Sequence, residues 1–160
     1  RLFEVTGVQT CALPISHTYE QKIDTIKAAQ KAGMEICSGG LIGLGEDLKD
    51  RIDMALQLRE LDIHSVPVNL LNPIKNTPLE NNKPLSMEEV NRTCATFRFI
   101  LPKALIRLAG GRALMEEFGK SAFKSGANAA ISGVLLTTKG ASIEEDMERF
   151  KELNYKVKAV

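Results

Sequence analysis

The chain has 160 residues, of which 44% are hydrophobic and 26% are charged, and its formal net charge is +1. This composition predicts one soluble globular domain, and the near balance of charge argues against a nucleic-acid or lipid surface. No apolar run approaches the roughly 18 residues of a membrane span, and three cysteines without a paired or zinc-like spacing favour a reducing, cytoplasmic compartment.

Residues 1–16 do not share the pattern of the rest of the chain. They begin without Met and lack both the basic region and the continuous apolar region of a signal peptide. A short β-rich segment is one interpretation. We prefer another, because residues 5–15, VTGVQTCALPI, resemble the translation of a common short-read sequencing adapter. We therefore predict that residues 1–16 are a non-native, adapter-derived segment, that Cys11 has no role, and that residues 17–160 form the domain.

From residue 18 onward the pattern alternates between helix and strand. Residues 18–32 are predicted as a helix that Gly33 ends, and residues 34–38 as a short buried strand. A glycine-rich turn then leads into a predicted helix over residues 48–61. This order is how α/β proteins build sites at the carboxyl ends of strands, although most glycine turns only connect elements.

The following segments repeat this order. Residues 64–74, HSVPVNLLNPI, have continuous apolar residues as in a parallel strand buried on both faces, although Pro67 cannot donate to the ladder. A loop over residues 72–85 and a capping box at Ser86 precede a helix to Ile100. The remaining predictions are strand 104–108, helix 114–124, strand 128–136, and a helix capped by Ser142 that runs to Leu153 with Ile143, Met147 and Phe150 inward.

Four alternations of strand and helix with short connections predict right-handed βαβ units and a parallel sheet, an α/β fold. Two architectures accommodate four such units. One is a small open doubly wound sheet, and the other is half of an eight-stranded barrel, which leaves two unpaired strand edges. The pattern of elements alone does not separate them.

Polar side chains interrupt the predicted strands, and each needs a partner if it is buried. Cys37 is interpreted either as a small buried apolar residue or as a thiolate metal ligand. Asn69 either satisfies neighbouring backbone or binds a ligand through its amide. A buried Arg107 requires a carboxylate, a ligand or a metal cluster, whereas Arg112 is either solvated or binds an anion. Cys94, on an apolar helix face, is interpreted as a core residue.

Six motifs carry a resemblance to a known family: ICSGGLIGLGE, SVPVNLLNPI, TPLENNKPL, IRLAGGR, GAN and LTTKG, in this order between residues 17 and 155. At these motifs the chain resembles biotin synthase, a family of radical S-adenosylmethionine enzymes. The resemblance implies a TIM-type (β/α)8 barrel, of which residues 17–160 supply the C-terminal half, about strands five to eight, with the closing helices. It also implies the conversion of dethiobiotin to biotin by a 5′-deoxyadenosyl radical.

The family uses two iron–sulfur clusters, and the resemblance assigns residues to one of them. A [4Fe-4S] cluster cleaves S-adenosylmethionine, and a [2Fe-2S] cluster held by three cysteines and an arginine donates sulfur. By motif, Cys37 in ICSGG matches one of those cysteines, and Arg107 in IRLAGG matches the arginine. Asn69 in VPVN matches the asparagine that hydrogen-bonds the ureido ring of dethiobiotin.

The S-adenosylmethionine site is implied by the radical-enzyme pattern GxIxGxxE. Gly39, Gly43 and Glu46 fit this pattern, with Leu41 in the isoleucine place beside the adenine. Asn72 occupies a position whose backbone meets that adenine. The resemblance thus predicts that residues after two neighbouring strands bind the cofactor.

The sequence also departs from the family. The CxxxCxxC loop that holds the [4Fe-4S] cluster is absent, as are the other two [2Fe-2S] cysteines, and Ala113 and Ala129 stand where glutamate and serine are common. We therefore expect the 160-residue polypeptide to be inactive alone. The full enzyme is expected to be a homodimer that takes electrons from a flavodoxin or ferredoxin. The alternatives are a relative of the hydrogenase-maturation or methylornithine synthase type, or a free-standing α/β binding module without redox chemistry.

Overall fold

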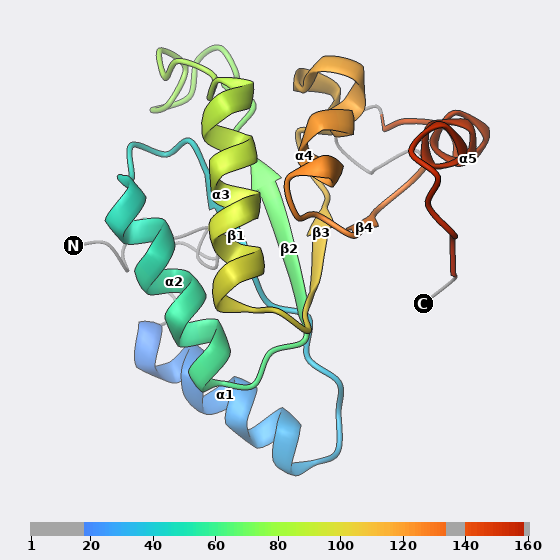
Figure 1. The fold of residues 1–160 in the computed structure, drawn as a ribbon. Coiled ribbons are helices and arrows are strands. Elements are labelled where there is room, and N and C mark those ends of the chain that lie inside the picture. The colour runs from blue at the N-terminus through green and yellow to red at the C-terminus, as the bar shows by residue number, and fades with distance from the viewer. Residues whose placement is uncertain (1–17, 134–139, 159–160) are drawn as a thin grey trace.

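The fold is described from a computed structural model that covers residues 18–133 and 140–158. Its centre is a parallel sheet whose strands lie in chain order (Figure 1). The segment predicted to be adapter-derived, residues 1–16, lies outside the described residues. Of the predicted strand 128–136 the structure shows the first part as β4, and residues 134–139 are also outside. The strands are β1 (Gly40–Ile42), β2 (Ser65–Leu70), β3 (Leu105–Leu108) and β4 (Ala129–Ala130).

The long helices begin at side-chain caps that the local sequence specifies. The capping boxes predicted at Ser86 and Ser142 are both formed, and Thr18 and Asp47 form two more. Each of these side chains accepts from a backbone N–H of the first turn that has no partner within the helix. Within the described residues, no helix has the length and hydropathy needed to cross a membrane. The helices are α1 (Tyr19–Lys31), α2 (Leu48–Glu60), α3 (Met87–Ile100), α4 (Lys120–Lys124) and α5 (Ile143–Glu152), with 3-10 turns η3 (Arg112–Leu114) and η4 (Glu116–Gly119).

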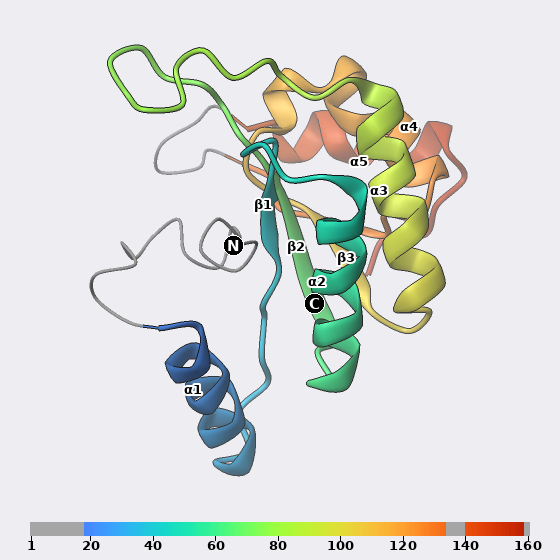
Figure 2. The same cartoon turned by 90° about the vertical axis from the view of Figure 1, so that its left-hand side faces the viewer.

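Helices α2, α3 and α4 lie on the same side of the sheet (Figure 2). Alternate strand residues, such as Val66, Val68 and Ile106, are fully buried in one core with Phe97 of α3 and Phe123 of α4. A doubly wound sheet carries helices on both faces, whereas the strands of a (β/α)8 barrel carry them on the outer face. The one-sided cover and the chain-order pairing therefore correspond to half of a barrel, and the second face of the sheet corresponds to the barrel interior.

The strand predicted over residues 34–38 is wrong in its bounds. Strand β1 begins after it, and only Cys37 of these residues pairs, in an isolated bridge with Ser65. Pro67 explains the interruption, because it lies just before the first residue of β2 that pairs with β1 and has no N–H to donate. The neighbouring strand also passes very close, since a Cβ on Gly39 would lie 2.0 Å from the carbonyl oxygen of Pro67. Glycine at this position is therefore required by packing.

The helix predicted over residues 114–124 is wrong in its first half. The chain forms the two 3-10 turns there, and α4 begins only at its end. Glu117 and Phe118 have left-handed φ values of 46° and 52°, which end any regular helix. The Arg112 guanidinium donates to the carbonyl oxygen of Phe118 at 3.2 and 3.1 Å. The side chain of Arg112, six residues before Phe118, thus holds this turn in a shape that helical periodicity does not reveal.

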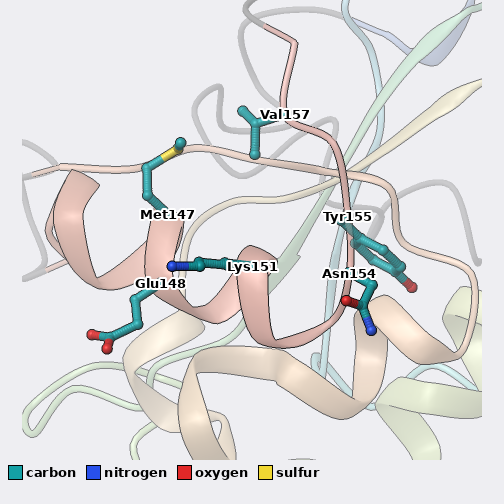
Figure 3. Close-up of a pocket in the computed structure, with 6 residues that line it drawn as sticks. All are labelled: Met147, Glu148, Lys151, Asn154, Tyr155 and Val157. Atoms are coloured by element: carbon teal, nitrogen blue, oxygen red, sulfur yellow. The ribbon is translucent and has the colours of Figure 1, made fainter.

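Helix α5 turns a different side inward than its apolar pattern predicts. Ile143 and Met147 are 61% and 48% exposed, whereas Asp146 is 1% exposed. Phe150 packs against the core as predicted, in an edge-to-face contact with Phe123 at 5.0 Å between ring centroids. Met147 instead lines a shallow hollow between α5 and the segment that follows it (Figure 3). The cause of this rotation is the ion pair of Asp146, described below.

Candidate functional site

The predicted site residues gather on the sheet face opposite the helices, in an order that follows the strand direction. Side chains alternate between the two faces of a strand. The parallel register places Cys37 level with Ser65 near the amino ends of the strands, and Leu41 level with Asn69 near the carboxyl ends. Arg107 lies between these two levels on the next strand. The structure therefore brings the predicted residues of three strands onto one face.

The hydroxyl of Ser65 connects Cys37 to Arg107. It donates to Cys37 Sγ at 3.2 Å and accepts from Arg107 Nη2 at 3.1 Å. Cys37 is exposed and Arg107 is half-buried. The sequence reasoning missed Ser65, although it stands two residues before Pro67 and four before Asn69 on the same strand. That spacing, with residues alternating on β2, is the signal that could have found it.

Arg107 does not have the carboxylate partner that was one explanation of its burial. Among the ion pairs of the described residues none includes Arg107, and its buried Nε has no hydrogen-bond partner there. An unsatisfied buried donor on a charged group is costly and marks a site where a ligand could bind. The donor faces the same side of the sheet as an exposed thiol, and this combination fits a metal–sulfur group.

The described residues supply only part of a metal site. They contain no group of three His, Cys, Asp or Glu side chains that could hold a metal ion. Cys37 and Arg107 offer one thiolate and one guanidinium, so a [2Fe-2S] cluster of the predicted type needs two further cysteines from elsewhere. Cys94 is not available, because it is fully buried on α3 and burial raises its pKa to about 12. Its interpretation as a core residue is confirmed.

Both polar atoms of the Asn69 side chain form hydrogen bonds with neighbouring backbone. Its Nδ2 donates to the Gly40 carbonyl at 3.3 Å, and its Oδ1 accepts from the Gly110 N–H at 2.8 Å. This amide therefore ties β1 to the turn after β3, as the structural alternative predicted. One N–H and one lone pair of the amide remain for a ligand, so its role toward dethiobiotin stays a prediction.

The glycine turn after β1 is held in shape by Glu46. Its two carboxylate oxygens accept from the N–H groups of Gly43 and Leu44 at 2.8 and 2.7 Å. Arg51, which is 6% exposed, donates to the same carboxylate at 2.9 Å and was missed in the sequence. Gly43 has a φ of +97°, which other residues rarely adopt. Glu46 therefore shapes the loop, and its role toward the cofactor stays a prediction.

The other residues predicted for cofactor binding lie around this turn. Leu41 is half-buried on the sheet face opposite the helices, called the inner face below. Asn72 is exposed just beyond the end of β2. Gly39, in contrast, is explained by its packing against Pro67. The carboxyl ends of β1 and β2 thus carry a glycine turn beside the exposed Asn72, which is compatible with a nucleoside-bearing ligand.

Arg112 is neither solvated nor a ligand site. It is 3% exposed, and Nη1 and Nη2 donate to the two carboxylate oxygens of Asp146 at 2.8 and 2.7 Å. The hydroxyl of Ser132 and the guanidinium of Arg149 donate to the same carboxylate. The predicted anion is therefore a side chain of the same chain, and this ion pair docks α5 on the turn after β3.

The ionisation of Asp146 makes the stability depend on pH. Burial raises its pKa, but the hydrogen bonds from Arg112 and Ser132 and the charges of Arg112 and Arg149 outweigh burial, so the pKa lies below its ordinary value. A carboxylate with a lowered folded-state pKa stabilises the fold above the unfolded pKa of about 3.9, and this contribution is lost as the pH falls through the folded value. We therefore expect the free energy of unfolding, measured with urea, to decrease as the pH is lowered below about 4. An Asp146→Asn variant with an equally steep decline would contradict the assignment.

Removing the Ser65 hydroxyl is expected to destabilise the inner face. Ser65→Ala leaves Arg107 without its hydrogen-bond acceptor, so we expect the free energy of unfolding to fall by about 1–2 kcal/mol. Ser65→Thr keeps the hydroxyl and suits a strand, and it serves as the matched control. Urea unfolding of the wild type, Ser65→Ala and Ser65→Thr at one pH measures the difference in stability. Equal stability of Ser65→Ala and wild type would show that the contact contributes nothing.

Comparison with known proteins agrees with these features. The profile of the Biotin and Thiamin Synthesis associated domain matches residues 67–156, more than half of the chain. The chain is 61% identical over 142 residues to a biotin synthase of Brachyspira hyodysenteriae and to one of Clostridium botulinum. Each alignment covers 89% of this chain but 43% and 45% of those proteins. The chain therefore spans less than half the length of the relatives that it matches.

Two solved structures share the fold. A crystal structure of methylornithine synthase matches 92% of this chain and 48% of its own with a TM-score of 0.68, at 18% identity. A crystal structure of a maturase of the [FeFe]-hydrogenase matches 87% and 34% with a TM-score of 0.67, at 20% identity. These likenesses concern the fold alone and confirm parallel (βα) units arranged as half of a (β/α)8 barrel. The resemblance to biotin synthase is confirmed by the sequence matches, and the chain belongs to the family of the Biotin and Thiamin Synthesis associated domain.

Proposed function

We propose that the chain forms the part of a biotin synthase that supplies Cys37 and Arg107 to a [2Fe-2S] cluster and Asn69 to dethiobiotin. The observation that carries this proposal is the connection of Cys37 and Arg107 through Ser65 on the inner sheet face. The buried Nε of Arg107 has no hydrogen-bond partner among the described residues, and a charged group is not expected on that face without one. The identity of 61% to two biotin synthases supports the same conclusion.

The residues present suggest how they divide the work. The Cys37 thiolate and the Arg107 guanidinium would hold the cluster, and Ser65 would keep both side chains on the inner face. When bound, such a cluster supplies sulfur to the substrate. The remaining N–H of Asn69 would bind the ureido carbonyl of dethiobiotin, nearer the carboxyl ends of the strands. The turn at Gly43 would bind the adenosyl part of S-adenosylmethionine.

The same proposal assigns the rest of the active site to sequence outside these 160 residues. The chain contains no CxxxCxxC motif, so the ligands of the [4Fe-4S] cluster have to come from another segment. We infer that the 160-residue polypeptide alone forms no biotin and that residues 1–16 are adapter-derived. The complete enzyme would act in the reducing cytoplasm as a homodimer supplied with electrons by a flavodoxin or ferredoxin.

A chimeric enzyme tests the proposal. Residues 18–158 would replace the matching segment of the Brachyspira biotin synthase, so that the relative supplies the missing cysteines. After anaerobic reconstitution with iron and sulfide, we expect dethiobiotin-dependent biotin formation within about tenfold of the parent enzyme, a loss of at most about 1.4 kcal/mol of transition-state stabilisation. The 160-residue chain treated in the same way is the negative control. A chimera that folds and holds both clusters but forms no biotin would refute the proposal and leave the binding module as the better account.

A further inference from the structure

One side-chain hydrogen bond joins the two loops at the carboxyl ends of β1 and β2. The Nδ2 of Asn82 donates to the carbonyl oxygen of Gly43 at 3.0 Å across 39 residues of sequence. Figure 2 shows the loop after β2 projecting from the sheet and returning past the end of β1 to α3. Asn82 lies on this returning arm and is half-buried. The two loops are those that carry Gly43 and Asn72, the residues proposed to flank the adenosyl group.

The bond completes a clamp on both sides of Gly43. Glu46 holds its N–H at 2.8 Å, while Asn82 holds its carbonyl oxygen. Leu85, on the same returning arm, also packs here, since a Cβ on Gly43 would lie 3.5 Å from Leu85 Cγ. The turn at Gly43 is therefore fixed by its own acidic residue and by the neighbouring loop together.

The loop after β2 is itself braced by short-range hydrogen bonds, one of which runs from the N–H of Asn82 to the carbonyl oxygen of Leu79 at 3.1 Å. The N–H of Asn76 donates to Glu80 Oε2 at 2.6 Å, and the hydroxyl of Thr77 donates to the Ile74 carbonyl at 2.6 Å. A hydrogen bond from a braced segment restrains its partner more than one from a freely moving chain, because less conformational entropy is lost on forming it. Asn82 can thus set the distance between the two loops.

We propose that Asn82 is a positioning residue that fixes the Gly43 turn against the Asn72 segment and so preorganises the slot for the adenosyl group of S-adenosylmethionine. Asn82 need not touch the cofactor for this role. The inference rests on the proposed function for the identity of the ligand. The clamp itself rests only on the contacts of Gly43, and it can be tested without activity.

Two variants of Asn82 and one variant of the preceding residue make the test. Asn82→Asp keeps the shape but removes the donor, Asn82→Ala removes both, and Asn81→Ala changes an exposed neighbour on the same arm. In the 160-residue chain, we expect both Asn82 variants to exchange the amide hydrogens of Gly43 and Leu44 about tenfold faster than wild type. Asn81→Ala is expected to exchange them at the wild-type rate. A wild-type rate in Asn82→Asp would overturn the clamp.

The same variants in the chimera test the link to the cofactor. We expect both Asn82 variants to raise the KM for S-adenosylmethionine about five- to tenfold, with the KM for dethiobiotin within about twofold of wild type. Equal increases for both substrates, or none, would overturn the positioning role. If the wild-type chimera forms no biotin, equilibrium binding of S-adenosylmethionine to the reconstituted chimera replaces the KM, and a loss of affinity only in the Asn82 variants is then the expected result. Failure of the proposed function and failure of this inference therefore give different results.

Discussion

Asp146→Ala is expected to lower the free energy of unfolding by about 3–5 kcal/mol, because it leaves a buried guanidinium without its counter-ion. Arg112 is 3% exposed, and its remaining hydrogen-bond partners are the backbone carbonyls of Phe118 and Ile131. These carbonyls satisfy hydrogen bonds but carry no net charge, so the cost of burying the cation is no longer offset. Urea unfolding at neutral pH measures the effect.

A matched control separates this effect from the general loss of a charge on α5. Glu152 lies on the same helix and pairs with Lys120 at 2.8 Å, but both side chains are partly exposed. Glu152→Ala is expected to leave the free energy of unfolding close to the wild-type value, since solvent screens such a pair. A double variant, Arg112→Met with Asp146→Leu, removes both charges and is expected to recover much of the lost stability. A loss below about 1 kcal/mol in Asp146→Ala would mean that the buried pair contributes no more than a surface pair.

The features that the sequence predicted correctly depend on neighbouring residues. The capping boxes at Ser86 and Ser142 specify where helices begin because the interacting groups lie three residues apart. The alternation of strands and helices likewise predicted a parallel sheet. Separating the barrel from the doubly wound sheet required the structure or the family resemblance, because the face that each helix covers is a property of the assembled sheet.

The features that the sequence did not predict depend on contacts between distant residues. Ile143 and Met147 fit an inward apolar stripe, but Arg112, more than 30 residues earlier, draws Asp146 inward in their place. The same arginine also donates to the carbonyl of Phe118 in the segment predicted as a regular helix, a contact across six residues that helical periodicity does not include either. Periodicity counts apolar residues and does not include a long-range ion pair, so it fails where such a pair decides the orientation.

The candidate site likewise contains residues that the sequence identified and residues that only the structure identified. Cys37 and Arg107 were identified because a thiol and a guanidinium are unusual within apolar strands. Ser65 and Asn82 are ordinary polar residues in sequence, and only their partners 28 and 39 residues away give them a role. Residues that organise a site from outside it are therefore the ones that require a structure.

Cys37→Ser in the chimera is expected to reduce biotin formation by on the order of 100-fold or more, since loss of a hydrogen bond to a metal ligand already costs about 10–100-fold at metal sites. The variant keeps the size of the side chain and its contact with Ser65, but a neutral hydroxyl is a poor ligand for iron in a sulfide cluster. We expect the [2Fe-2S] absorption to be lost after reconstitution, while the [4Fe-4S] cluster of the other half still forms. Anaerobic absorption and Mössbauer spectra measure the two clusters separately.

Cys94→Ala provides the control that makes this result specific. Cys94 is the other described cysteine, but it is fully buried on α3 and lies on the opposite side of the sheet from Cys37. Its replacement is expected to lower stability modestly and to leave both clusters in place. If Cys37→Ser retained a complete [2Fe-2S] cluster and normal turnover, the thiol would have no part in the cluster. The unpartnered Nε of Arg107 would then need a different ligand, and the assignment of the inner sheet face to sulfur chemistry would fail with it.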